Sequence, residues 1–181
     1  MRCKVPHSVE VREMRNSREE ELIRASSAVI ADRSQFARRL TRNMLIGLGM
    51  RSITEVGDGS SALEAISSSK PDVLIIDWEL PNMSGIDVIR RIRSPGAFPF
   101  PDLPILMLTT RTERRYVVQA MAYGANEFIA KPTSTSTLRD RLISVLCHRR
   151  AMVRLGDFYV PKPRVWPSPL VEASSPDANP V

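Results

Sequence analysis

Four side chains suited to phosphoryl chemistry each follow a short apolar run. Two are carboxylates, one is a hydroxyl and one is an amine: Asp32, Asp77, Thr109 and Lys131. Carboxylate oxygens are hard ligands that Mg²⁺ prefers, and Mg²⁺ usually takes only one or two of them from a protein. A hydroxyl and an ammonium group can hold the other oxygens of a transferring phosphoryl group. If the four side chains meet, they form a magnesium-assisted phosphoryl site.

Each of these residues has an ordinary structural explanation when it is taken alone. An aspartate after a buried strand often serves a turn or a helix cap, and a threonine at a strand end fits the β preference of its branched side chain. A lysine before a proline, as in Lys131-Pro132, is usually an exposed loop charge. The functional interpretation therefore depends on the elements that position all four.

Short apolar runs predict five strands buried on both faces. They are residues 28–30, 52–56, 73–76, 105–108 and 128–130. Apolar spacing of three or four residues predicts a helix after each strand. The apolar positions are Phe36, Leu40, Met44 and Leu48; Ala62, Leu63 and Ile66; Ile86, Ile89 and Ile92; Val117, Ala120 and Met121; and Leu138, Leu142, Val145 and Leu146. Ser60 is expected to cap the second helix, and Thr112 to begin the fourth.

Five strand–helix repeats indicate an α/β domain with a doubly wound parallel sheet. Right-handed crossovers bring the carboxyl ends of all the strands to one edge, where open sheets of this kind bind ligands. The four chemically suited residues lie at the carboxyl ends of the first, third, fourth and fifth strands. The topology therefore predicts that they converge.

The chain divides into three regions of different composition. Residues 1–24 are charged and are expected to be a solvated helix or a disordered arm. Residues 25–150 hold the strand–helix repeats. Residues 151–181 contain six prolines, which predict an extended tail without regular structure, although Phe158, Tyr159, Val160, Val165 and Trp166 give it apolar groups for docking.

Composition excludes several classes of protein. The sequence contains no run of about 18 apolar residues, so it predicts no membrane-spanning helix. The N-terminus lacks the apolar stretch of a secretory signal. Cys3 and Cys147 have no metal-like or disulfide-like spacing, so we expect a reduced, cytoplasmic protein. The net charge is +6, but the arginines are scattered and no nucleic-acid motif accompanies them, which favours solvated helix faces.

Three segments carry a family resemblance. They are residues 73–85 (VLIIDWELPNMSG), 106–110 (LMLTT) and 123–132 (YGANEFIAKP). With them, residues 26 to about 148 resemble the receiver domain of two-component response regulators, of the chemotaxis-regulator type. The resemblance implies a flavodoxin-like fold with five helices and strand order 2-1-3-4-5.

The resemblance also implies a role for each site residue. Asp77 is the expected phosphoacceptor, and Mg²⁺ is held by Asp32, Asp77 and the backbone carbonyl of Glu79. Thr109 and Lys131 contact the phosphoryl oxygens. Thr109 and the aromatic Phe128 form the conformational switch. Three further residues are expected on the rim of the pocket: Trp78, Thr110 and Arg111.

The implied partners are a histidine kinase or histidine phosphotransfer protein as donor, and an unidentified downstream protein. We expect a phosphorylated signalling protein that catalyses only its own phosphoryl transfer. The 31 residues after position 150 are too few and too rich in proline for a DNA-binding domain. Homodimerisation through the face of the fourth helix, fifth strand and fifth helix stays open.

Two features depart from the family pattern or extend it. The family has two adjacent acids after the first strand, whereas this chain has Ala31-Asp32, which predicts weaker binding of Mg²⁺. Glu79 and Arg111 each lie two residues beyond a site residue. If they pair across the pocket, they block the water that hydrolyses the acyl phosphate, which predicts slow autodephosphorylation.

Two other interpretations compete with a working receiver. Ala31 supports a pseudo-receiver, which is a binding module of the same fold that no longer needs phosphate. A phosphatase or another hydrolase of the doubly wound class would need a second acid beside Asp77 as general acid or base, and the sequence lacks one.

Overall fold

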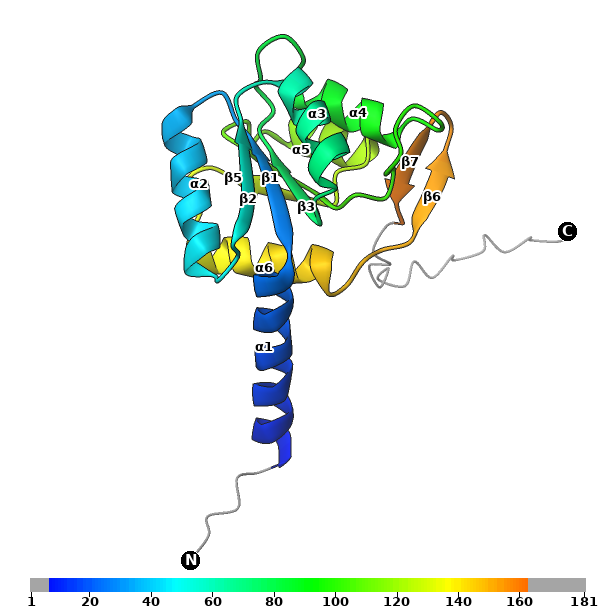
Figure 1. Cartoon of the computed structure of the whole chain (residues 1–181). Helices are drawn as coiled ribbons and strands as arrows, with labels where there is room; N and C mark the ends of the chain where they lie inside the picture. The colour runs from blue at the N-terminus through cyan, green and yellow to red at the C-terminus, as the bar shows by residue number, and fades with distance from the viewer. Residues whose placement is uncertain (1–6, 163–181) are drawn as a thin grey trace, which may run out of the picture.

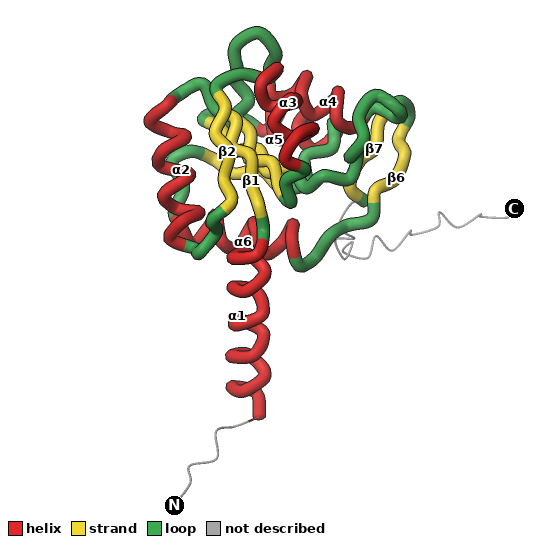
Figure 2. The backbone as a smooth tube through the Cα atoms, in the orientation of Figure 1, coloured by secondary structure: helices red, strands yellow, loops and turns green. Residues whose placement is uncertain are grey.

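The computed structural model describes residues 7–162, with side chains from residue 14 onward. Its centre is a sheet of five parallel strands in the order β2-β1-β3-β4-β5. Figure 2 draws the strands in yellow. The strands are β1 (Ser27–Ala31), β2 (Ser52–Val56), β3 (Val73–Ile76), β4 (Ile105–Thr109) and β5 (Glu127–Ala130). Because β1 pairs with both β2 and β3, the chain reverses direction across the sheet next to β1, and such a reversal is where open sheets of this kind bind ligands. The predicted fold class and strand order are confirmed.

Helices cover both faces of the sheet (Figure 1). They are α1 (His7–Ala25), α2 (Gln35–Gly47), α3 (Gly59–Ser69), α4 (Gly85–Arg93), α5 (Arg114–Ala122) and α6 (Thr135–Leu146). One apolar cluster joins the sheet to α2, α6 and the end of α1, and a second joins the opposite face to α3, α4 and α5. The five predicted helices are α2 to α6. The charged segment before β1 forms a sixth helix, α1. A helix was one of the two structures expected for this segment, the other being a disordered arm.

Three local predictions were wrong. Phe36 and Leu40 do not face the core, since they are 78% and 46% exposed. The other two residues of that predicted row, Met44 and Leu48, do pack against the core, beside the fully buried Leu45. Asp58 rather than Ser60 caps α3, because its carboxylate accepts a hydrogen bond from the backbone of Ser61 at 2.9 Å. That bond lowers the pKa of Asp58 below its ordinary 3.8. The cap residue of α5 is Glu113, one residue after the predicted start.

A fully buried arginine fixes the loop between α4 and β4. Arg93 donates hydrogen bonds to the carbonyl oxygens of Pro101, Leu103 and Gly124 at 2.6, 2.8 and 3.0 Å. It also donates to Asn126 Oδ1 at 3.0 Å. Burial lowers the pKa of Arg93 to about 9, which still leaves it charged at neutral pH. The proline-rich loop it holds is therefore a self-packed connector, and the two phenylalanine rings of the loop contact each other edge to face.

The expectation of an extended C-terminal tail was wrong for its first part. Strands β6 (Met152–Leu155) and β7 (Phe158–Pro161) form an antiparallel hairpin that lies beside α4. Its loop is Gly156-Asp157, and Gly156 adopts φ +59°, a conformation suited to glycine in two-residue hairpins. The Phe158 ring packs edge to face on Tyr123 at 5.7 Å, as the predicted docking role requires. Val165 and Trp166 lie outside the described residues.

Candidate functional site

The first site carboxylate, Asp32, follows β1 at the carboxyl edge of the sheet. Its side chain is held from two directions. The backbone N–H of Ser34 donates to Asp32 Oδ1 at 2.8 Å, and Lys131 Nζ donates to Oδ2. Only 3% of Asp32 is exposed, so its charge depends on these partners instead of on bulk water. The carboxylate is therefore fixed toward the centre of the strand edge.

The second carboxylate, Asp77, follows β3, and the loop after it makes an unusually close approach to a helix. A Cβ atom built on Gly85, the first residue of α4, would lie 2.0 Å from the backbone oxygen of Asp77. Gly85 N–H also donates to the carbonyl of Trp78 at 2.9 Å. Any residue other than glycine would therefore push the Asp77 loop away from the sheet edge.

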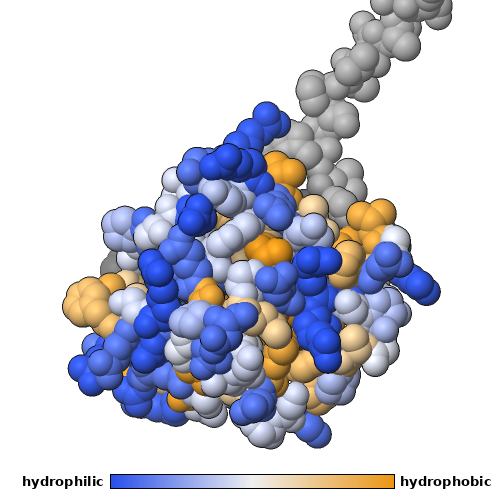
Figure 3. Space-filling model, turned by 90° about the horizontal axis from the view of Figure 1, so that it is seen from above, coloured by the Kyte–Doolittle hydropathy of each residue, from blue (hydrophilic) through white to orange (hydrophobic). Residues whose placement is uncertain are grey.

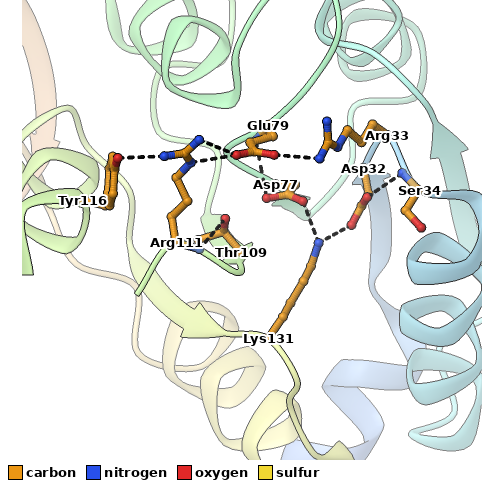
Figure 4. A network of polar contacts seen from close by, with 9 residues as sticks. All are labelled: Asp32, Arg33, Ser34, Asp77, Glu79, Thr109, Arg111, Tyr116 and Lys131. Carbon is orange, nitrogen blue, oxygen red and sulfur yellow. Dashed lines mark hydrogen bonds and ion pairs between the residues drawn. The ribbon is translucent and has the colours of Figure 1, made fainter. Parts of the chain in front are cut away.

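Lys131 joins the two carboxylates. It follows β5, and its ammonium group donates to Asp77 Oδ2 at 2.7 Å as well as to Asp32 (Figure 4). The side chains of Asp32, Asp77 and Lys131 are 4%, 9% and 17% exposed. The structure thus brings together three of the four chemically suited residues, with one cation shared by two buried anions.

The fourth residue, Thr109, ends β4 and is fully buried. Its hydroxyl oxygen accepts a hydrogen bond from the backbone N–H of Arg111 at 3.3 Å. The neighbouring strand carries Phe128, which faces Met107 in the β4–β5 register and packs partly buried against the α3–α5 side of the core. Thr109 and Phe128, the expected switch pair, therefore lie on adjacent strands.

A second layer of charge lies above the carboxylates. Glu79 Oε1 accepts a hydrogen bond from Arg111 Nε at 2.8 Å, and Glu79 Oε2 lies 2.8 Å from Arg33 Nη2 (Figure 4). Arg111 Nη1 also donates to the hydroxyl of Tyr116 at 2.7 Å. The bonds with Glu79 and then Tyr116 raise the pKa of Arg111 above its ordinary value. We call Arg33, Glu79, Arg111 and Tyr116 the arginine bridge.

The pairing of Glu79 with Arg111, which their spacing raised as a condition, is present in the structure. Arg33 and Tyr116 were missed. Arg33 follows Asp32 directly at the same strand end, which is a signal that could have found it. Tyr116 lies within α5 and carries no such signal.

The remaining rim residues differ in their surroundings. Trp78 is partly buried and packs edge to face on Tyr116, with ring centroids 4.9 Å apart. Thr110 is exposed. Figure 3 looks onto this end of the molecule, whose surface is mainly hydrophilic with separate hydrophobic patches.

The carboxylates at the strand edge decide whether a divalent cation fits this site. Within residues 7–162, no three His, Cys, Asp or Glu side chains form a group that could hold a metal ion. Asp32 and Asp77 nevertheless converge on one cation, the ammonium of Lys131. Two carboxylates satisfy the protein's usual share of Mg²⁺ ligands when phosphate oxygens and water supply the rest. The residues therefore fit Mg²⁺ if Lys131 yields its place between them.

Comparisons with known proteins agree with this fold. The family model of the response regulator receiver domain matches residues 28–143, which is more than half of the chain. The chain therefore belongs to the response-regulator receiver family, whose members are signalling domains of two-component systems. Within residues 7–162, no helix combines the length and the apolar character needed to cross a membrane.

Named chemotaxis proteins are among its relatives. The chain is 33% identical over 114 residues to the chemotaxis protein CheY-3 of Vibrio cholerae, which covers 63% of this chain and 86% of that protein. It is 34% identical over 119 residues to the chemotaxis protein CheY1 of Helicobacter pylori, covering 65% and 94%.

Solved structures of receiver domains and response regulators share this fold. A response regulator from Chloroflexus aurantiacus is 29% identical with a TM-score of 0.63, and covers 67% of this chain and 98% of its own. The receiver domain of the sensor histidine kinase PA1611 from Pseudomonas aeruginosa shares the fold at 24% identity and a TM-score of 0.61, covering 67% and 98%. That structure has a magnesium ion coordinated in its active site cleft.

Proposed function

We propose that this protein accepts a phosphoryl group from a phosphohistidine donor on Asp77, with Mg²⁺ bound, and signals through contact with another protein. The observation that carries the proposal is the ammonium of Lys131 between the buried carboxylates of Asp32 and Asp77. This arrangement leaves a carboxylate nucleophile and a neutralising cation side by side. The donor is a histidine kinase or a histidine phosphotransfer protein, and the proposal includes a cytoplasmic location.

Asp77 Oδ1 is the nucleophile. It is the more weakly held oxygen, since its contact is the backbone N–H of Glu79 at 3.5 Å, whereas Oδ2 accepts from Lys131 at 2.7 Å. The oxygen attacks phosphorus in line with the bond to the donor nitrogen. The O–P bond forms as the N–P bond breaks, and the donor imidazole leaves with the electron pair and takes a proton from solvent.

Lys131 and Thr109 act on the transferred group. Lys131 is positioned to move its ammonium from the Asp32 carboxylate to a phosphoryl oxygen and so to offset the added negative charge. The hydroxyl oxygen of Thr109 already accepts a bond from Arg111, which leaves its proton to donate to another phosphoryl oxygen. Asp32, Asp77 and the backbone carbonyl of Glu79 would hold Mg²⁺, which when bound supplies further charge neutralisation.

Output runs through the switch pair in this proposal. A phosphoryl group that draws Thr109 toward Asp77 leaves space behind it on β4, and Phe128 on the adjacent strand moves into that space. Phe128 lies on β5, which contacts α5, so the face formed by α5, β5 and α6 is repacked for an unidentified partner.

One observation favours a second candidate function. Ala31 occupies the place of the family's additional acid, so the site has two carboxylates instead of three. A pseudo-receiver would keep the Asp32–Lys131–Asp77 contacts as a structural ion pair and bind its partner without phosphate.

Intact-mass measurement after incubation with Mg²⁺ and acetyl phosphate separates the two candidates. Wild type and the exposed-site control Asp157→Asn are expected to gain one phosphoryl group, and Asp77→Asn none. No adduct on wild type, even at high Mg²⁺ and with a phosphohistidine donor, would establish the pseudo-receiver.

A further inference from the structure

α1 extends away from the domain, beyond α6 (Figure 1). Its last turns are anchored, since Ile23 is 1% exposed and Glu19 forms an ion pair with Arg139 of α6 at 3.6 Å. Its preceding turns project into solvent. Isolated helical segments shorter than about 12–15 residues are marginally stable in water, so the projecting turns of α1 would gain stability from a partner.

A groove of about 1500 Å³ runs along α1 to the carboxyl end of α6, where Cys147 lines it. On the α1 side it combines apolar and charged groups. Met14 and Leu22 are 73% and 38% exposed, although both are large hydrophobic side chains. The charged groups include Arg18 and Glu21, for which the described part of the chain provides no ion-pair partner.

The spacing of the α1 residues in the groove is that of a helix-pairing seam. Met14, Arg18, Glu21 and Ala25 are separated by four, three and four residues, which are the intervals of the inward positions of a coiled coil. Leu22 flanks this seam. Among the side chains that the structure describes on this helix, Arg15 pairs with Glu19 and Arg24 with Glu20.

We propose that α1 is a homodimerisation helix whose groove receives α1 of a second copy, antiparallel to it. In the antiparallel register that places Arg18 against Glu21 of the second copy, Met14 meets Ala25 of that copy and Leu22 meets its Ser17. The same contacts recur on the other side of the two-fold axis, as an isologous interface requires. Arg18 and Glu21, which have no ion-pair partner among the described residues, then pair with each other at two places in the interface. A parallel pair of helices would instead place Arg18 beside Arg18 and Glu21 beside Glu21.

This interface is separate from the phosphoryl site, so the proposal does not depend on the proposed function. Sedimentation velocity of the full-length protein tests it over a range of concentrations. Wild type is expected to reach twice the 20.3 kDa mass of one chain as the concentration rises. If the protein stays monomeric at every concentration, the proposal is overturned. This holds also if the C-terminal residues of the same chain occupy the groove.

Charge reversal tests the register. Arg18→Glu or Glu21→Arg alone places like charges together twice and is expected to raise the dimer dissociation constant by about tenfold. The double variant Arg18→Glu/Glu21→Arg restores both pairs and the wild-type constant. Single variants that dimerise like wild type, or a double variant that fails to recover, overturn the register and with it the antiparallel interface.

Apolar substitution tests the location. Met14→Glu and Leu22→Glu are expected to abolish the dimer, whereas Val118→Glu is not, because Val118 is an equally exposed apolar residue on α5. Loss of the dimer in Val118→Glu alone would assign it to the α5–β5–α6 face and overturn the proposal. Circular dichroism of each variant shows that its domain is folded.

Discussion

Lys131 and Asp77 are 54 residues apart in the chain and are joined by a hydrogen bond of 2.7 Å. The same ammonium group also bonds Asp32, 99 residues away. One lysine thus ties the ends of β1, β3 and β5 together at the edge where the phosphoryl group would arrive. Its charge serves both the resting structure and, in the proposed function, the transferred group.

Replacing this lysine tests both roles. Lys131→Met leaves two buried carboxylates without their shared cation, so we expect the free energy of unfolding to fall by about 3 kcal/mol. Phosphoryl uptake from acetyl phosphate should be largely lost. Urea denaturation and intact mass measure the two effects, with the exposed Lys162→Met as control. Because Mg²⁺ can replace the missing cation, adding it should recover part of the stability, and a variant as stable as wild type without Mg²⁺ would contradict this account.

The arginine bridge is expected to protect the acyl phosphate. Arg111→Ala removes the partner that holds Glu79 and Tyr116, which opens the pocket to water. We expect the phosphorylated variant to decay several-fold faster than wild type. Decay of the phosphorylated mass over time measures this rate. Arg114→Ala, an exposed arginine of α5, serves as the control, and an unchanged lifetime in Arg111→Ala would remove the bridge from the mechanism.

Restoring the missing acid is expected to tighten metal binding. Ala31 is buried, and its carbonyl accepts a hydrogen bond from the backbone N–H of Asp77 at 2.9 Å. Ala31→Asp therefore adds a carboxylate beside the two already present, and we expect Mg²⁺ affinity to rise by about tenfold. Isothermal titration calorimetry gives the affinity. Ala31→Asn separates charge from size, and equal gains in both variants would rule out the added charge as the cause.

The buried arginine is expected to be a structural requirement. Arg93→Met leaves the carbonyls of Pro101, Leu103 and Gly124 without a donor, so we expect a loss of about 3–5 kcal/mol in unfolding free energy. Urea denaturation measures it against Arg91→Met, whose side chain is exposed on the same helix. A loss no larger than that of the control would show that water satisfies these carbonyls.

The sequence predicted the sheet and the convergence of the site because both follow from strand order. Asp77 directly follows the apolar strand Val73–Ile76, and the parallel topology of the sheet then determines where Asp77 lies. Contacts that depend on helix rotation were not predictable in this way. Regular spacing of Phe36 and Leu40 indicated an inward face, but both are exposed, and the fully buried residue of α2 is Leu45, which is offset from that row. The hairpin was missed because the later prolines dominated the composition, although Gly156-Asp157 is itself a hairpin signal.

The close approach of Gly85 to Asp77 has a consequence for genetic experiments. In a library randomised at codon 85 and selected for phosphoryl uptake, only glycine should survive, since even a methyl group would overlap the Asp77 carbonyl. Codon 47 offers the opposite case: it also encodes a helical glycine, but a Cβ there meets nothing within 4 Å. Many residues should be recovered at that codon, with alanine among the most stable because it favours helix. The two glycines, indistinguishable by residue type, would therefore differ completely in their tolerance of change.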